Sequence, residues 1–312
     1  MNNTKKVEKS KKYLPISCLC SIYINTTYEE ILLALKSILV QDCLPKQIII
    51  VVDGPIKKKI QIFINHLISE YKIFKIVYSS QNEGLGLALK KGLKFCDYDI
   101  VARFDSDDIN LKDRLAKQYS YLTKNENIDI LGTYVKEFNK KDNKIFSRLK
   151  IVPKNDVQIK SIINLRNPMN HPTIMFRKDA IIRSGSYISM NFFEDYYLWL
   201  RCKSRNFIFA NEDYPSVAMK RESNINRRHG LKYGFYELKF ICLCLMKRLV
   251  PFHNFLFMIL RVLLRISPKF FSIIFYKYDK QRSDFILDQN LNDYIKKLNA
   301  FKFRYEKDYF FE

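Results

Sequence analysis

The sequence lacks the features of disulfide-rich, zinc-binding and membrane-spanning proteins. Its seven cysteines form an odd set without a C-x-x-C pair. Such a set predicts neither a disulfide framework nor a zinc site, and it fits a protein of the reducing cytosol. No stretch reaches the roughly 18 uncharged apolar residues of a spanning helix. The longest candidate, at 249–260, is too short.

The N-terminal region also lacks the marks of a cleavable signal peptide. It has a basic start and a short apolar run, but no small-residue cleavage site, and Pro15 stands at the front of the run. We interpret residues 1–12 as a solvated basic tail that precedes a first strand.

The composition is that of a globular, strongly basic protein. Of the 312 residues, 47% are hydrophobic, which is enough for a core in one large domain or two small ones. Lysine and arginine number 54 against 32 acidic residues. Residues 221–280 hold twelve of these cations and only three acids, and are also strongly apolar and aromatic. This segment therefore differs from the rest of the chain.

The hydrophobic pattern predicts an α/β fold. Short apolar runs alternate with stretches of helical period, which indicates a parallel sheet with right-handed crossovers. The expected strands are 16–24, 48–52, 73–78 and 99–104, and the expected helices follow Thr27 and cover 57–71 and 84–95. Mixed elements come next, with strands at 128–135, 144–150 and 171–178 and helices at 154–164 and 195–204. Because no linker or repeat separates 13–110 from 111–220, we expect these two halves to share one mixed sheet.

Three aspartates follow the fourth apolar run within four positions: Asp105, Asp107 and Asp108. One interpretation is that Asp107 or Asp108 caps a helix that begins near Leu111. Capping explains one aspartate but not three, because crowded anions raise one another's pKa unless a cation is present. We therefore expect Asp105 and Asp107 to hold Mn²⁺ or Mg²⁺, with phosphate oxygens as further ligands.

Other polar residues are expected at the same edge of the sheet. Asp53 ends the second strand and, taken alone, indicates an Asx-type turn. Because ligands of open parallel sheets sit beyond the carboxyl ends of the strands, Asp53 is also placed to accept a hydrogen bond from a uracil imide N–H. Gly84 and Gly86 do not have the spacing of a dinucleotide fingerprint. They predict instead a close approach of a nucleotide to the backbone at a helix start.

Two further groups have both a structural and a functional interpretation. Glu194 and Asp195 begin a helix, where an acidic pair is ordinary capping, but an aromatic-lined carboxylate is also what a catalytic base requires. A lone histidine such as His171 is more often a structural hydrogen-bonder. The functional alternative for His171 and for Trp199 is contact with an acceptor substrate.

A basic loop at 227–229 is open to two interpretations. Arg227, Arg228 and His229 form either a solvated basic face or a clamp on a departing phosphate. We favour the clamp and assign Arg228 to the donor nucleotide.

Five motifs stand in order along the chain: PISCLCSIYI (15–24), VVDGP (51–55), NEGLGLALKKGL (82–93), VARFDSDD (101–108) and FEDYYLWLR (193–201). Together they resemble the family 2 glycosyltransferases of the GT-A fold over about residues 14–235. The segments RNPMNHPT and RRHGLKY resemble bacterial enzymes of the amylovoran and capsule biosynthesis type. The resemblance implies a nucleotide-binding half at 13–110 and an acceptor-binding half at 111–220.

The resemblance also implies roles for individual residues. Asp105 and Asp107 correspond to the D-x-D pair that holds the metal and the diphosphate of a nucleotide-sugar, with Ser106 between them. Asp195 corresponds to the catalytic base of an inverting transfer, supported by Glu194, and Asp53 to the residue that contacts the nucleotide base.

This chain departs from the family pattern in two places. Many relatives have a polar, Asn-bearing stretch soon after the first strand, where this chain has SIYINTTYEE. Ser21 and Tyr23 are still expected to face the nucleotide. The Q-x-x-R-W signature of processive synthases is absent, which favours transfer of a single sugar.

The segment 221–312 is expected to be a helical, basic appendage. Basic amphipathic helices lie in the membrane interface, where anionic headgroups attract them. The alternative is an ordinary helical cap on the catalytic core. We expect a cytoplasmic enzyme on the inner face of the cytoplasmic membrane, with a lipid-linked saccharide as acceptor and no nucleic acid as partner.

Two other functions fit the sequence less well than a metal-dependent hexosyltransferase that uses a UDP-hexose or UDP-N-acetylhexosamine. A sugar nucleotidyltransferase needs a Gly-rich, Arg-bearing loop after the first strand, and SIYINTTYEE does not provide one. A non-enzymatic basic protein that binds membrane or nucleic acid leaves the placement of the aspartates unexplained.

Overall fold

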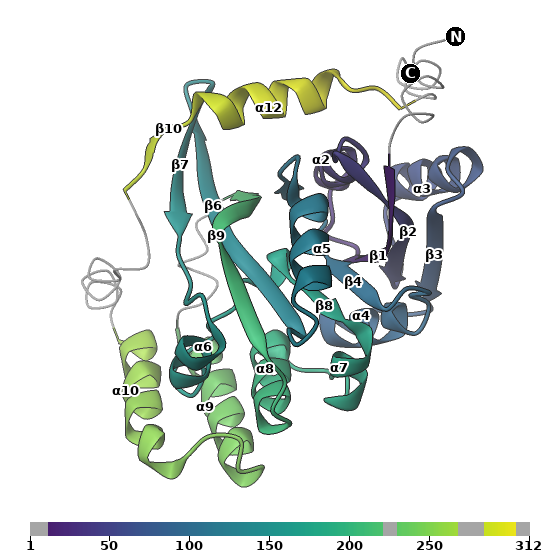
Figure 1. Cartoon of the computed structure of the whole chain (residues 1–312). Helices are drawn as coiled ribbons and strands as arrows, with labels where there is room; N and C mark the ends of the chain where they lie inside the picture. Colours follow the sequence, from purple (N-terminus) through teal and green to yellow (C-terminus); the bar gives the residue numbers. More distant parts are fainter. Residues whose placement is uncertain (1–11, 221–229, 268–283, 304–312) are drawn as a thin grey trace.

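The computed structural model describes residues 12–220, 230–267 and 284–303, which fold around one mixed sheet (Figure 1). Its first half is parallel, in the order β4-β1-β2-β3. The strands are β1 (Lys12–Ile22), β2 (Cys43–Asp53), β3 (Phe74–Ser79) and β4 (Ile100–Arg103). The crossover helices are α2 (Tyr28–Leu39), α3 (Lys58–Glu70) and α4 (Leu85–Leu93). The prediction of a parallel α/β half is confirmed.

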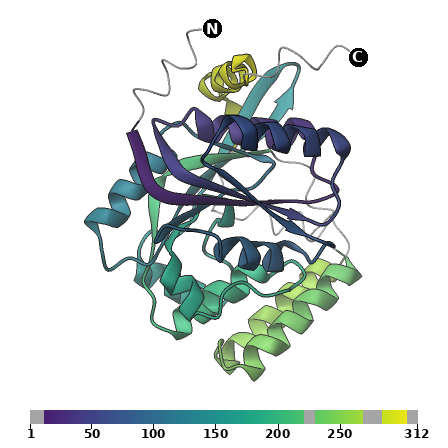
Figure 2. The same ribbon diagram turned by 90° about the vertical axis from the view of Figure 1, so that its right-hand side faces the viewer.

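Both faces of these strands are buried under helices (Figure 2). Alternate residues of a strand point to opposite faces, so Leu19 joins one core cluster while Cys18 and Cys20 join the other. Thr27 begins α2 with a capping box to Glu30, as the spacing predicts.

The second half continues the same sheet with mostly antiparallel pairs, which confirms the single mixed sheet. β8 (Met175–Arg177) pairs with β4 and with β6 (Ile130–Lys141), and β6 pairs with β7 (Lys144–Lys150). The helical elements here are α5 (Arg114–Lys124), α6 (Asp156–Ile162), the 3-10 turn η1 (His171–Thr173), α7 (Lys178–Arg183) and α8 (Glu194–Ser204).

Two strands of this half were not predicted from the sequence. β5 (Asp108–Asn110) pairs with β9 (Phe209–Lys220), and β9 runs parallel to β6. β5 has only three residues. In β9 the polar residues and the proline interrupt the alternation of apolar and polar residues that would indicate a strand. The pairing of β5 also corrects the capping interpretation, because the residues from Asp108 onward are strand and helix α5 begins only at Arg114.

The C-terminal helices that the structure describes pack on the rest of the chain, which favours the alternative of a helical cap. Helix α9 (Leu231–Met246) buries Phe240 and Ile241 in the same core cluster as α8, and α10 (Phe255–Ile266) follows the short turn η2 (Phe252–Asn254). β10 (Ile286–Leu287) extends the sheet beside β7, and α12 (Gln289–Ala300) packs on β7 and α2. Figure 1 shows α9 and α10 at one end of the molecule and α12 at the other. None of the helices that the structure describes has the length and apolar character needed to cross a bilayer.

Candidate active site

Three carboxylates gather where β4 ends and β5 begins. One carboxylate oxygen from each of Asp105, Asp107 and Asp108 can be chosen so that all lie within 4.8 Å of one another. Asp107 is exposed, whereas Asp108 is buried and its Oδ2 has no hydrogen-bond partner within the described part of the chain. A buried carboxylate oxygen without a partner is costly, and oxygen-seeking divalent cations are the ions that such clusters bind. The cluster therefore fits the predicted metal, with Asp108 as an additional candidate ligand.

Mutual repulsion in this cluster shows in its protonation. Although Asp107 is exposed as a residue, loss of solvation at its carboxyl group, followed by the charge of Asp105, raises its pKa to about 6. Burial, again with the charge of Asp105, raises the pKa of Asp108 well above its usual range. A cation at this place would remove the repulsion that favours the protonated forms.

Two buried arginines that sequence reasoning missed hold the cluster in place. Arg103 is almost fully buried and pairs with Asp105 through both guanidinium nitrogens, one of them 2.6 Å from Oδ2. Arg114 is fully buried, and its Nη2 donates a 2.6 Å hydrogen bond to the Arg103 carbonyl. An arginine inside the apolar run IVARF was the available signal, because arginine is rarely buried unless it is paired.

Asp53 lies at the end of β2, where it braces the loop that leads into α4. Its Oδ1 accepts a hydrogen bond from the Glu83 N–H at 2.8 Å and its Oδ2 accepts one from the Gly84 N–H at 2.9 Å. Gly54 has φ +81°, and a Cβ there would stand 2.6 Å from the Asn82 nitrogen. The turn therefore requires glycine, and the contact of Asp53 with a nucleotide base stays a prediction.

The two glycines of the α4 start have different surroundings. Gly84 is the N-cap of α4 with φ +87°, and the space around its missing Cβ is open, which is compatible with the predicted approach of a nucleotide. A Cβ at Gly86 would clash with the carbonyl of Ile188. The contact with Ile188 therefore explains the glycine at position 86 without a nucleotide. Approach of a nucleotide to Gly86 stays a prediction.

The acidic pair occupies the first turn of α8. Asn167 Nδ2 donates a 2.7 Å hydrogen bond to Asp195 Oδ2, and the Tyr196 N–H donates one of 2.7 Å to Asp195 Oδ1. The Met169 N–H donates to Asn167 Oδ1 at 3.1 Å, which fixes the orientation of the amide. Asn167 was not predicted as a site residue, although it lies in the quoted segment RNPMNHPT.

The pair and the aspartate cluster are electrostatically coupled. Burial, followed by the charge of Asp195, raises the pKa of Glu194 to about 7. Arg103 lowers this pKa and Asp105 raises it further, so the charges of the aspartate cluster reach Glu194. Asp105 and Glu194 thus lie near enough to interact electrostatically, and the assignment of these acids to one catalytic site stays a prediction.

The two residues predicted to bind an acceptor, His171 and Trp199, are both buried. Trp199 is fully buried in the core cluster, which favours a packing role, and its contact with an acceptor stays a prediction. His171 is also buried, with Nε2 3.1 Å from Tyr187 Oη and its ring edge-on to Trp199. Burial, with a contribution from Arg103, holds the pKa of His171 well below its usual value. These contacts support the structural interpretation, and contact of His171 with an acceptor stays a prediction.

The remaining predicted residues are partly accounted for. Ser21 is half-buried at the end of β1, Tyr23 is exposed just after it, and Ser106 is half-buried between the aspartates. Their contacts with a nucleotide stay predictions. Arg228, with the rest of the 227–229 loop, lies outside the described residues.

Comparison with known proteins decides the family. The model of "Glycosyl transferase family 2" matches residues 19–185. The chain is 32% identical to the amylovoran biosynthesis glycosyltransferase AmsE of Erwinia amylovora over 85% of this chain and 98% of that protein. The chain belongs to glycosyltransferase family 2. This membership decides against the sugar nucleotidyltransferase and the non-enzymatic basic protein.

The chain is also similar to a second relative and to a solved structure. It is 33% identical to the UDP-Gal:alpha-D-GlcNAc-diphosphoundecaprenol beta-1,3-galactosyltransferase of Escherichia coli, over 84% of this chain and 94% of that one. The structure of S. aureus TarS 1-349 in complex with UDP-GlcNAc has a TM-score of 0.58 at 16% identity, covering 81% of this chain and 72% of that one. At this identity the likeness concerns the fold, and the mixed α/β sheet is consistent with GT-A.

Proposed function

We propose that this family 2 glycosyltransferase is metal-dependent and inverting, and that it moves a single hexose or N-acetylhexosamine from a UDP-sugar to a saccharide acceptor. The observation that carries the proposal is the electrostatic coupling of two acidic groups, one after β4 and one at the start of α8. One is the aspartate cluster with the unpaired Asp108 oxygen, and the other is the Glu194–Asp195 pair. The first suits a cation with a diphosphate, and the second suits a base.

The cation would be held by Asp105 and Asp107, beside Asp108. When bound, it would neutralise the negative charge that develops on a departing diphosphate. Arg103 keeps Asp105 in position through its paired guanidinium.

The transfer itself is assigned to the α8 acids. Asp195 takes the proton of the acceptor hydroxyl, whose oxygen forms a bond to the anomeric carbon on the face opposite the leaving group. The bond between that carbon and the diphosphate oxygen breaks, UDP leaves, and the configuration inverts. Asn167 keeps the Asp195 carboxylate oriented through its 2.7 Å hydrogen bond. A fixed base in hydrogen-bond reach of the proton is the geometric requirement for this step.

The substrates are inferred from the relatives. The E. coli relative is named for UDP-Gal as donor and for a GlcNAc-diphosphoundecaprenol acceptor, and TarS was solved with UDP and with UDP-GlcNAc. We therefore assign a uridine donor and a lipid-linked saccharide acceptor in bacterial surface polysaccharide biosynthesis.

The test is sugar transfer by the purified chain to a GlcNAc-diphospholipid, with UDP release measured over a panel of UDP-sugars. We expect Asp107→Ala and Asp195→Asn to abolish transfer and Glu194→Gln to retain part of it. The unfolding temperature of each variant in EDTA should equal that of the wild type or be slightly higher. Asp142→Asn, which removes an exposed carboxylate from the β6–β7 turn, serves as the control. Transfer that persists in EDTA, or in the Asp107→Ala variant, would contradict the metal-dependent mechanism.

A further inference from the structure

Helix α10 presents an apolar face to solvent. Leu256, Leu260 and Leu263 are 78%, 52% and 58% exposed, and their spacing places them on one side of the helix. Phe252 and Phe257 are exposed beside them. We call these five residues the α10 face. The opposite side of α10 is buried, with Met258 and Val262 in the core cluster that includes α9.

The segment that carries the α10 face is basic. Residues 230–267 contain a single carboxylate, Glu237, which is fully buried and paired with Arg261 at 2.6 Å. The exposed charged side chains that the structure describes in this range are all basic: Lys232, Lys239, Lys247 and Arg248. Burying the one acid therefore leaves a segment in which an exposed apolar face is combined with exposed positive charges only.

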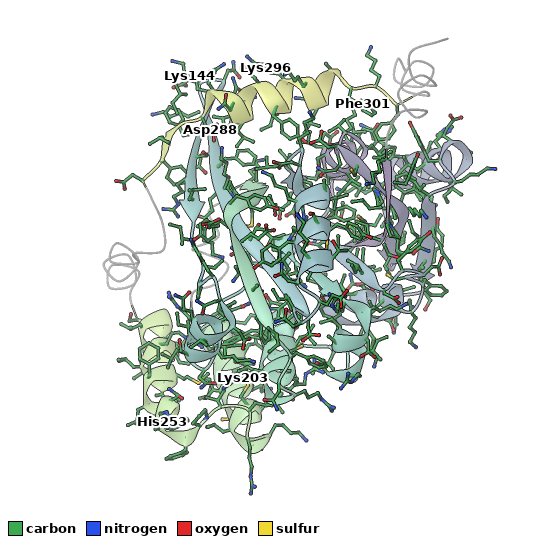
Figure 3. All side chains as sticks on the ribbon, viewed as in Figure 1. Lys144, Lys203, His253, Asp288, Lys296 and Phe301 are labelled. Atoms are coloured by element: carbon green, nitrogen blue, oxygen red, sulfur yellow. The ribbon has the colours of Figure 1, made fainter. Side chains whose placement is uncertain are left out.

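Helix α10 is connected by hydrogen bonds to the loop that carries Asn167. Figure 2 shows the α9–α10 pair projecting from the body, and Figure 3 places Lys203 of α8 and His253 at one end of the molecule, with Asp288 and Lys296 at the other. A guanidinium nitrogen of Arg261 on α10 donates to the carbonyl of Leu165, two residues before Asn167. Asn167 in turn holds Asp195. The helix is thus tied to the loop that positions the base.

We infer that the α10 face docks on an anionic lipid bilayer, with the helix lying in the interface. Exposed leucine and phenylalanine side chains with surrounding lysines are the composition of interfacial helices. Anionic headgroups match the positive charge, whereas a second copy docked face to face would bring charges of the same sign together. The inference goes beyond the transfer reaction, and vesicle binding can be measured without donor, acceptor or metal.

The experiment is flotation of the full chain with phosphatidylcholine vesicles that contain or lack phosphatidylglycerol. The pair Leu256→Asp and Leu260→Asp removes the apolar contact, and the pair Lys239→Glu and Lys247→Glu reverses charge. The matched control is Ile62→Asp with Ile68→Asp, two exposed isoleucines on α3.

The wild type and the isoleucine control should float with the anionic vesicles and be released by salt. Partitioning should fall by about fivefold for each lysine lost and by about tenfold or more for each leucine. UDP release with a soluble acceptor analogue should be equal in all variants, so that failure of catalysis and failure of docking remain separate.

Three results would overturn the inference. The first is a wild type that binds anionic vesicles no better than neutral ones, and the second is equal binding by the aspartate pair and the isoleucine control. The third is an aspartate pair that turns a dimer into a monomer or lowers the unfolding temperature more than the control does. In that case the face is covered by another copy or by this chain itself.

Discussion

Binding of a divalent cation by the aspartate cluster should weaken sharply below about pH 6. The perturbation is a change of pH from about 7.5 to about 5, a range in which Asp107, with a pKa of about 6, takes up its proton. A carboxylate must lose its proton before it can bind a cation, so protons and metal compete for the same oxygens.

The size of the effect follows from the protonated fraction of Asp107. Nearly every molecule carries an ionised Asp107 at about pH 7.5, and roughly one in ten does at about pH 5. The apparent affinity for Mn²⁺ should therefore fall about tenfold through Asp107 alone. Asp108 should steepen the dependence, because its pKa is also raised.

Without metal, the effect of Asp107 on the free energy of unfolding has the opposite pH dependence. The pKa of Asp107 is 3.8 in its unperturbed form and about 6 in the folded chain, so the folded state binds more protons between these values. The contribution of Asp107 to the free energy of unfolding is thus most favourable below about pH 4 and is lost as the pH rises through about 6. With saturating Mn²⁺, stability should instead rise over the same range, because the cation binds the ionised folded state.

The assay is thermal unfolding in EDTA and in a Mn²⁺ titration, at both ends of this pH range. The Asp142→Asn variant should behave like the wild type, whereas Asp107→Asn with Asp108→Asn should lose both the Mn²⁺ response and its pH dependence. An Mn²⁺-induced shift that is equal at the two pH values, or that survives in the double variant, would refute the reasoning.

Three further predictions concern residues that support the site. Asn167→Ala should lower kcat by about 10- to 100-fold with a nearly unchanged KM for the donor, because the lost hydrogen bond orients Asp195; steady-state kinetics would show it. Arg103→Met should lower the free energy of unfolding by about 3–5 kcal/mol in urea, because an acid is left unpaired, and Mn²⁺ should restore part of the loss. Gly54→Ala should cost about 1–3 kcal/mol, and more than Gly84→Ala in the same assay, since only Gly54 also meets backbone atoms of the facing loop.

The parallel half could be predicted because its signals are local. The run at 48–52 is apolar throughout, and it forms the centre of β2 with every residue buried. β9 could not be predicted in this way, because its partners β5 and β6 supply the hydrogen bonds that hold a polar, proline-containing segment extended. The C-terminal helices are predicted as helices, but which of their faces is buried depends on distant elements, such as α8 for α9 and β7 for α12.

In the candidate site, too, residues with a local sequence signal could be predicted, and residues that depend on a distant partner could not. Asp105 and Asp107 could be named because a charge cluster after a buried strand is visible in the sequence. Asn167 could not, because its partner Asp195 is 28 residues away and its amide is an ordinary loop residue until the fold brings the two together. The burial of Trp199 could not be predicted either, because the start of a helix does not reveal which of its residues face the core.

The buried arginines explain how the chain tolerates its own site. Three carboxylates form the aspartate cluster and two more begin α8, and within the described residues Arg103 is the cation that pairs with a member of the cluster. The raised pKa values of Asp107 and Glu194 show that protons relieve part of the repulsion when no other cation does so. A divalent ion would relieve the repulsion within the aspartate cluster at neutral pH without protonating its carboxylates. Repulsion between these carboxylates thus lowers the stability of the folded chain at the site where the reaction needs negative charge. The packing of the rest of the sheet compensates for this loss.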